Sequence, residues 1–191
     1  MRARAWIAAA VGILIFVTVP RELAVAESTQ ANQRAEARKA EDAANPKDVE
    51  NVDAIVAAIY DVISGPPGER NWGRFRSLFV PEGRLTAVRV SKEGNVSYAM
   101  MSVDDYASHA GAYFKDHGFY ESEISRKTEQ FGHMAHVYST YASRDSKDAA
   151  PFQRGINSIE LFNDGKRWWC VSIYWDAERP GNPIPEKYLA H

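Results

Sequence analysis

Apolar residues follow a helical spacing over residues 46–118 and the alternation of strands over residues 119–176. We expect the first helix to begin at Asn45-Pro46, because asparagine caps helices and proline suits the first helical position. The apolar residues that follow share one helical face: Val49, Val52, Val56, Ile59, Tyr60 and Ile63. Glycine and proline at 64–68 cannot continue a helix, so this helix is expected to end there.

A shorter second helix and a pair of strands are predicted next. Asn71 caps this helix and Pro81 ends it. Its inward positions are aromatic or apolar: Trp72, Phe75, Leu78 and Phe79. Residues 85–90 and 96–100 then read as a hairpin around a Glu-Gly-Asn turn.

A third helix is predicted to start at Ser102. Ser102 and Asp105 have the spacing of a capping box, in which each side chain bonds the backbone N–H of the other. Met101 and Tyr106 are placed to pack across this cap. The apolar stripe then runs as far as Gly118, where we expect the helix to end.

Four long strands complete the chain, over residues 119–131, 134–143, 152–162 and 167–176. Asn163-Asp164-Gly165 marks a tight turn between the last two. Helices followed by an antiparallel meander indicate an α+β domain, with three N-terminal helices packed on one face of a curved antiparallel sheet.

The last strand has an unusual composition, because residues 168–175 are apolar or aromatic on both faces. A strand of an antiparallel sheet that is apolar on both sides needs two covers. The helices supply one, and a second subunit is the simplest source of the other. The strand therefore predicts a homodimer formed through the sheet face.

The N-terminus has the order of an export signal. Arg2 and Arg4 precede an apolar run at 6–19, and small residues follow at 24 and 26. The run is shorter than the roughly 20 residues that span a bilayer core. We therefore expect a signal peptide at 1–26, a flexible linker at 27–45 and one domain at 46–191, placed in the periplasm or secreted. An uncleaved signal would instead anchor the domain to a membrane.

Charge and cysteine content narrow the function classes. The formal charge is −2, and loss of residues 1–26, which carry three arginines and one glutamate, changes it to −4. An acidic domain without a lysine or arginine block is not expected to bind nucleic acid. Cys170 is the only cysteine, so no intramolecular disulfide can form, and its apolar surroundings favour a buried structural role.

Three stretches, at 71–79, 135–141 and 157–169, resemble the SnoaL-like branch of the nuclear transport factor two-like superfamily. The resemblance covers about residues 48–190 and rests also on the order of the elements. It implies a cystatin-like cone of sheet and helices with an internal pocket. It does not fix an activity, since the superfamily includes isomerases, dehydratases, hydrolases, ligand carriers and interaction modules.

Sequence motifs for metals and cofactors are absent from the chain. There is no Walker loop, no G-x-S-x-G and no H-E-x-x-H. His133 and His136 lie three residues apart on a predicted strand, so they point to opposite faces and cannot share one ion. We expect His133 to be solvated and predict neither metal nor cofactor.

The resemblance places pocket chemistry on the first and third helices and on the concave strand faces. His136, with Asp61 or His109, is the candidate acid–base group, and Asp61 is otherwise expected to face water. Scytalone-type dehydratases carry an aspartate a few residues before the tryptophan of the second helix. This chain has Pro-Pro-Gly-Glu there, at residues 66–69, which argues against that particular chemistry. The candidate ligand-binding residues are mostly aromatic: Tyr60, Trp72, Phe75, Tyr113, Phe114, Tyr138 and Asn157.

These residues leave three functions open. The first is a binding domain for a small apolar or aromatic molecule. The second is an isomerase, dehydratase or hydrolase that uses the pocket His and Asp. The third is a non-catalytic protein-interaction module that works through its exposed sheet face.

Overall fold

The structure is a computed structural model, and it describes residues 44–189. The predicted signal peptide at 1–26 and nearly all of the predicted linker at 27–45 lie outside the described residues. Within residues 44–189, none of the helices has the length and apolar character needed to cross a membrane.

The first predicted helix is in fact two helices. Helix α2 spans Pro46–Val49 and helix α3 spans Val52–Ile63. The break has a local cause at Asn51, whose side chain accepts a hydrogen bond of 2.8 Å from the backbone N–H of Ala54. Asparagine in that conformation starts a new helix instead of continuing the old one.

The second predicted helix ends earlier than the sequence suggested. Helix α4 spans Trp72–Ser77, and strand β1 runs from Phe79 to Val90, so the predictions of a helical Phe79 and of a helix end at Pro81 are wrong. Phe79 pairs instead with Cys170 on the last strand. Pro81 falls where the register of β1 shifts, a place where the missing N–H removes no ladder hydrogen bond.

The hairpin and the third helix follow the prediction closely. Strand β2, Val96–Ser102, pairs with β1, and helix α5 spans Val103–Phe114. Both hydrogen bonds of the predicted capping box are present at the start of α5. The helix ends four residues before Gly118.

The four long strands are confirmed to within a residue or so at each end. They are β3 (Tyr120–Phe131), β4 (Met134–Arg144), β5 (Gln153–Asn163) and β6 (Trp168–Ala177). The sheet order is β2-β1-β6-β5-β4-β3. The pair β1–β6 is parallel, so the sheet is mixed and not wholly antiparallel.

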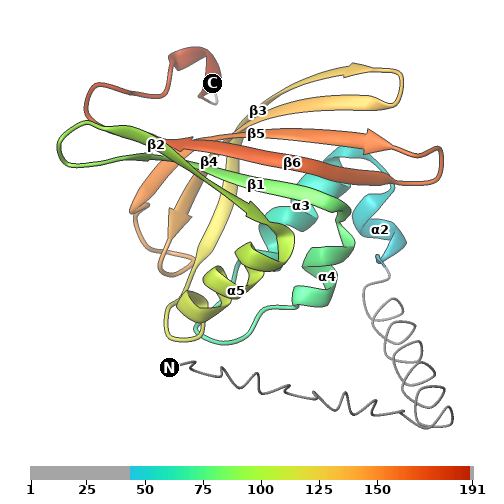
Figure 1. The fold of residues 1–191 in the computed structure, drawn as a ribbon, viewed down its shortest axis with the longest axis horizontal. Coiled ribbons are helices and arrows are strands. Elements are labelled where there is room, and N and C mark those ends of the chain that lie inside the picture. The colour runs from blue at the N-terminus through green and yellow to red at the C-terminus, as the bar shows by residue number, and fades with distance from the viewer. Residues whose placement is uncertain (1–43, 190–191) are drawn as a thin grey trace, which may run out of the picture. The chain divides into compact units, whose positions relative to one another are not determined.

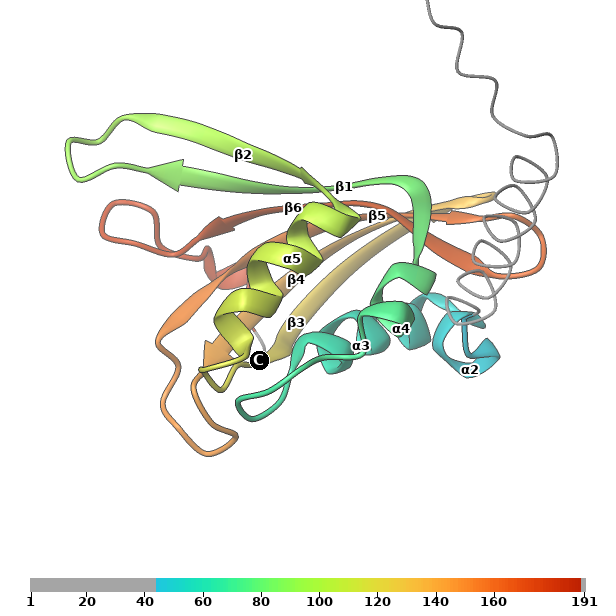
Figure 2. The ribbon, with the colours of Figure 1, turned by 60° about the horizontal axis from the view of Figure 1, so that its bottom comes forward.

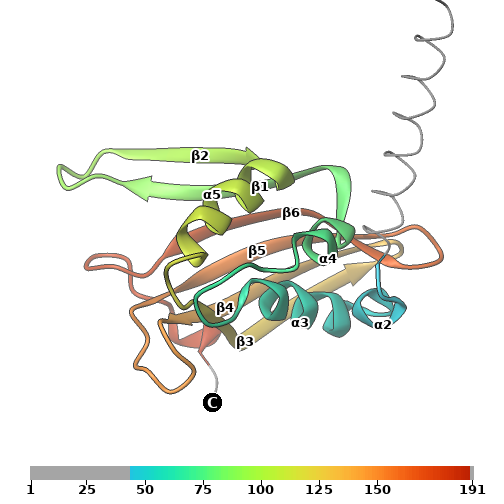
Figure 3. The same cartoon turned by 90° about the horizontal axis from the view of Figure 1, so that it is seen from below.

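The helices lie on one face of this curved sheet, as Figures 1, 2 and 3 show. The α+β fold class is therefore confirmed. The core lies between the two layers and includes Ile55, Phe75, Leu78, Val137 and Ile159, each at most 1% exposed. Cys170 belongs to this core, and burial raises the pKa of its thiol, which fits its predicted structural role.

The opposite face carries none of the described α-helices, so we call it the helix-free face; only the short 3-10 helix η1 (Glu186–Tyr188), in the C-terminal segment, lies there (Figure 1). The Thr140 hydroxyl donates a 2.6 Å hydrogen bond to the backbone carbonyl of Tyr188, and the Tyr188 ring lies 4.8 Å from that of Tyr138. These contacts hold the C-terminal segment against part of this face.

Candidate functional site

A cavity of about 350 Å³ lies between the helices and the sheet. Its wall is mainly apolar and comes from α3, α4, α5 and all of the strands. The apolar and aromatic lining residues are Ile59, Ile63, Phe75, Leu85, Met101, Tyr106, Ala110, Tyr113, Phe114, Phe119, Tyr141, Ile173 and Trp175. Four polar residues complete the lining: His109, Glu121, Gln153 and Asn157.

Glu121 is the acidic group of this cavity. The Ser143 hydroxyl donates a 2.7 Å hydrogen bond to its Oε2, and Asn157 Nδ2 lies 3.5 Å from its Oε1. Removal from water disfavours the carboxylate and raises the pKa of Glu121 to about 7, although the hydrogen bonds from Ser143 and Asn157 oppose the shift. Near neutral pH this carboxyl group can therefore donate or accept a proton.

The strand register explains why Glu121 points inward. Glu121 pairs with Ser143, which is fully buried on the helix side of β4. Residues directly opposite each other in an antiparallel pair share a face. Further along β3 a bulge between Glu123 and Ser125 inserts one residue, which brings Arg126 onto the same face as Glu123.

A chain of hydrogen bonds connects this site with the edge of the domain. Asn157 Nδ2 lies 3.1 Å from the Tyr60 hydroxyl, which lies 2.7 Å from the Ser139 hydroxyl. Ser139 donates to Glu123 Oε2 at 2.5 Å, and Arg126 Nε donates to Glu123 Oε1 at 2.7 Å. Burial raises the pKa of Tyr60, so its phenol stays protonated.

The exposed lining residues mark the mouth of the cavity. His109 and Gln153 are exposed lining residues, and Tyr113, beside them, is 46% exposed. Tyr106 and Tyr141 lie deeper, and burial raises the pKa of both phenols. A ligand entering here would pass these hydrogen-bonding side chains before it reached Glu121 and Asn157 in the interior.

The structure brings four of the seven predicted ligand-binding residues to this cavity: Phe75, Tyr113, Phe114 and Asn157. Tyr60 stands behind Asn157 and contacts it through its hydroxyl. Trp72 packs on the rings of Phe75 and Phe114 and does not line the cavity.

Tyr138 is on the other face of the sheet, so its predicted place in the concave pocket is wrong. Strand alternation is the cause, since the neighbouring Val137 and Ser139 are buried on the helix side. Tyr138 instead lines a second cavity, of about 460 Å³, between the sheet and the C-terminal segment.

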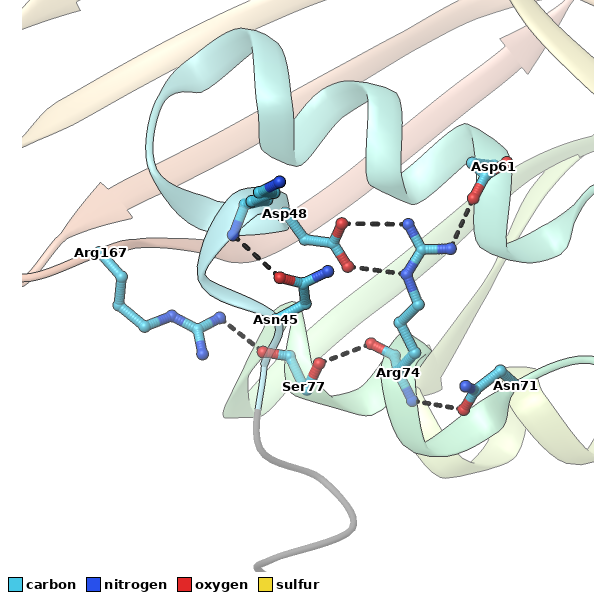
Figure 4. A network of polar contacts seen from close by, with 8 residues as sticks. Asn45, Asp48, Asp61, Asn71, Arg74, Ser77 and Arg167 are labelled. Carbon is cyan, nitrogen blue, oxygen red and sulfur yellow. Dashed lines mark hydrogen bonds and ion pairs between the residues drawn. The ribbon is translucent and has the colours of Figure 1, made fainter.

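The acid–base candidate Asp61 does not reach the cavity either. It follows Ile59 on α3 by two residues, a step that turns it away from the inner face. Its carboxylate pairs with Arg74 at 2.5 Å, and its side chain is 69% exposed. Arg74 also holds Asp48, at 2.7 and 3.1 Å, so Asp61 is the outer member of a surface ion-pair cluster (Figure 4).

His136 lies on the helix-free face, beyond the sheet from the cavity. Its Nε2 lies 3.0 Å from the Ser158 hydroxyl and 3.7 Å from Glu160 Oε1. The expected constellation of His136 with Asp61 or His109 therefore does not form, because the three residues occupy three separate places and only His109 lines the cavity. His133 is exposed in the β3–β4 turn.

The sequence analysis missed Glu121. One signal pointed to it, because Glu121 follows the cavity residue Phe119 by two positions and alternation puts the two on one face. A glutamate in a strand is nevertheless expected to face water unless its partners are known. Those partners, Ser143 and Asn157, come from strands 22 and 36 residues away.

No group of His, Cys, Asp and Glu within residues 44–189 has the arrangement of a metal site. The predicted absence of a metal or cofactor stays a prediction.

Comparison with known proteins gives structural similarity only. No profile of a known protein family and no curated protein matches the chain. A protein of unknown function with a cystatin-like fold from Nostoc punctiforme superposes with a TM-score of 0.52 at 8% identity, over 66% of this chain and 88% of that one.

Two further structures agree at a similar level. A protein of unknown function from Mycobacterium tuberculosis gives a TM-score of 0.51 at 14% identity, over 71% of this chain and 80% of its own. The beta subunit of a putative aromatic-ring-hydroxylating dioxygenase from Novosphingobium aromaticivorans gives a TM-score of 0.51 at 15% identity, over 70% of this chain and 94% of its own. The chain therefore has the cystatin-like fold that its resemblance to the SnoaL-like branch of the nuclear transport factor two-like superfamily predicted.

Proposed function

We propose that the cavity binds a small, largely apolar molecule and that Glu121 and Asn157 hold its polar end. The volume of about 350 Å³ lies within the range of small-molecule sites. Such sites combine an apolar wall with a few converging polar groups, which is the composition of this lining. The observation that carries the proposal is the placement of Glu121, with Asn157 beside it, in a largely apolar interior.

Titration calorimetry with β-naphthol, a two-ring aromatic alcohol, tests this proposal. Ala110 lines the cavity, so the ring of Ala110→Phe would take up part of the space and is expected to lower the affinity at least tenfold. Ser108→Phe is the matched control, because Ser108 is exposed on the same helix. Undiminished binding to Ala110→Phe, or no binding by the unaltered protein of β-naphthol and a panel of aromatic and isoprenoid compounds, would refute the proposal.

A second candidate function is acid–base catalysis by Glu121, and it is favoured by the burial of this carboxyl group in the cavity wall, which raises its pKa to about 7. A carboxylate of that basicity is suited to removing a proton next to a carbonyl group. The test uses β-tetralone, an enolisable two-ring ketone, in deuterated buffer. Exchange of its α-protons, followed by NMR, is expected to be accelerated by the protein and to return to the buffer rate with Glu121→Gln; acceleration that survives Glu121→Gln excludes this role.

A homodimer through the helix-free face is part of the proposal. Eight large apolar side chains on this face are at least 36% exposed: Val90, Val96, Tyr98, Met100, Phe131, Met134, Phe162 and Tyr174. Such a surface favours association with a second copy. Sedimentation of Tyr98→Glu is expected to show a monomer where the unaltered protein is a dimer, while Lys92→Glu in the β1–β2 turn leaves the dimer intact. A monomeric unaltered protein would refute this part.

A further inference from the structure

In the hydrogen bonds behind the cavity, the chemistry of the partners determines which group donates and which accepts. Glu123 accepts a charge-assisted hydrogen bond from the Arg126 guanidinium, so its carboxylate acts as an acceptor toward Ser139 as well. Ser139 has a single hydroxyl proton and gives it to Glu123. The Tyr60 hydroxyl, 2.7 Å from Ser139, must therefore donate to Ser139.

The same argument fixes the amide of Asn157. The phenol proton of Tyr60 is already given to Ser139, so the oxygen of Tyr60 can only accept from Asn157. Nδ2 therefore faces Tyr60 at 3.1 Å, with its second proton on the side of Glu121 Oε1 at 3.5 Å. With the amide reversed, Asn157 Oδ1 would face the Tyr60 oxygen, and neither atom would have a proton to donate to the other.

This orientation leaves the carbonyl oxygen of Asn157 for a ligand. Asn157 makes its hydrogen bonds through Nδ2 and lines the cavity. Within the described part of the chain, no buried side-chain nitrogen or oxygen lacks a partner. Oδ1 has none from the protein, so it must be open to the cavity, where it is a fixed acceptor.

We propose that Glu123, through Ser139 and Tyr60, fixes Asn157 as a hydrogen-bond acceptor, so that the cavity selects apolar molecules that carry a hydroxyl or N–H donor. This inference rests on the proposed binding function and adds the ligand class to it. Asn157 and an ionised Glu121 would then both accept from the ligand. An ether or a fully substituted amine of the same shape would leave Asn157 Oδ1 without a partner.

The test compares β-naphthol with its methyl ether at about pH 5, below the Glu121 pKa of about 7, where the protonated carboxyl group neither requires a donor from the ligand nor opposes reversal of the Asn157 amide. The unaltered protein is expected to bind the alcohol about three to ten times more tightly, the effect of one net hydrogen bond. Ser139→Ala removes the acceptor of Tyr60, which frees the phenol to donate to a reversed Asn157 amide. The ratio of the two affinities is then expected to fall to about one, because Asn157 now presents N–H to the cavity.

Thr140→Ala is the matched control. Thr140 is a buried hydroxyl residue next to Ser139 that points to the opposite face and donates to the carbonyl of Tyr188. A purely structural effect lowers both affinities and leaves their ratio unchanged, which is the result expected for Thr140→Ala.

The outcomes separate this inference from the function on which it rests. Equal binding of the alcohol and the ether by the unaltered protein would contradict the role of Asn157 as a fixed acceptor, but it would still support the proposed binding function. An unchanged ratio in Ser139→Ala would also overturn it, since the selection would then not depend on the orientation of the Asn157 amide. Binding of neither compound would overturn both.

Discussion

The Ser143 hydroxyl and the Glu121 carboxylate are joined by a 2.7 Å hydrogen bond between directly opposed residues of β3 and β4. The bond favours the ionised form of Glu121, but removal of the carboxylate from water outweighs it, and the pKa rises to about 7. The folded protein therefore binds this proton more tightly than the unfolded chain does, with consequences for stability.

The first prediction is a loss of stability with rising pH. A raised folded-state pKa gives stability that is complete below the ordinary value of 4.5 and is lost as the pH rises through about 7. Relative to Glu121→Gln, which does not titrate, the free energy of unfolding of the unaltered protein is expected to fall by up to about 3 kcal/mol across this range. Urea unfolding at several pH values measures this difference.

Glu129→Gln provides the control for that series, because Glu129 is exposed on the same strand. Its free energy of unfolding is expected to change with pH in the same way as that of the unaltered protein. If the free energy of unfolding of Glu121→Gln changes with pH as that of the unaltered protein does, Glu121 titrates like a solvated carboxylate and the first prediction is wrong.

The second prediction concerns the hydroxyl of Tyr60. Tyr60→Phe keeps the ring but leaves the Ser139 hydroxyl and the Asn157 amide without their shared partner. Two buried polar groups that lose a hydrogen bond are expected to lower the free energy of unfolding by about 2 kcal/mol. Ser146→Ala, which removes an exposed hydroxyl between β4 and β5, is expected to change it by less than about 0.5 kcal/mol. Equal effects of the two changes would show that the buried hydrogen bonds of Tyr60 contribute little to the free energy of unfolding.

The elements that local chemistry determines could be predicted from the sequence. The capping box at Ser102 and Asp105 needs only two residues three positions apart, and it forms as expected. Strands β3, β4 and β5 follow from alternation over ten or more residues each, and β6 follows from a run rich in apolar and aromatic residues. Phe79 was misplaced because its conformation depends on pairing with Cys170, 91 positions later, which no local pattern encodes.

The candidate site was less predictable, for a related reason. Alternation puts His136 and Tyr138 on one face but does not say which face the helices cover. That choice follows from the burial of Val137 and Ser139, which depends on the packing of α3. Glu121 becomes a site residue only through partners on β4 and β5, so its role appears only in the folded chain.

The third prediction separates the two carboxylates that Arg74 holds. Asp48 makes two hydrogen bonds to the guanidinium and is 11% exposed, whereas Asp61 makes one and is 69% exposed (Figure 4). Asp48→Asn is expected to lower the free energy of unfolding by about 2 kcal/mol, because it leaves a partly buried guanidinium without its bidentate partner. Asp61→Asn is expected to change it by less than about 1 kcal/mol.

Asp61→Asn also addresses the earlier acid–base hypothesis. The variant is expected to bind β-naphthol as the unaltered protein does, because Asp61 lies outside the cavity lining. A loss of binding without a loss of stability would show that Asp61 takes part in ligand binding.

The last prediction concerns the cap of α5, which supplies more of the cavity wall than any other helix between residues 44 and 189. The Ser102 hydroxyl accepts from the backbone N–H of Asp105 at 3.1 Å, and the Asp105 carboxylate accepts from the backbone N–H of Ser102 at 3.1 Å. Ser102→Ala breaks the first of these bonds and is expected to lower the free energy of unfolding by about 1 kcal/mol. Ser108→Ala, at an exposed interior position of the same helix, is expected to raise it by up to about 0.5 kcal/mol, since alanine favours the helical conformation. Urea unfolding of both variants measures the opposite signs, and a loss of similar size in both would mean that the cap does not stabilise α5.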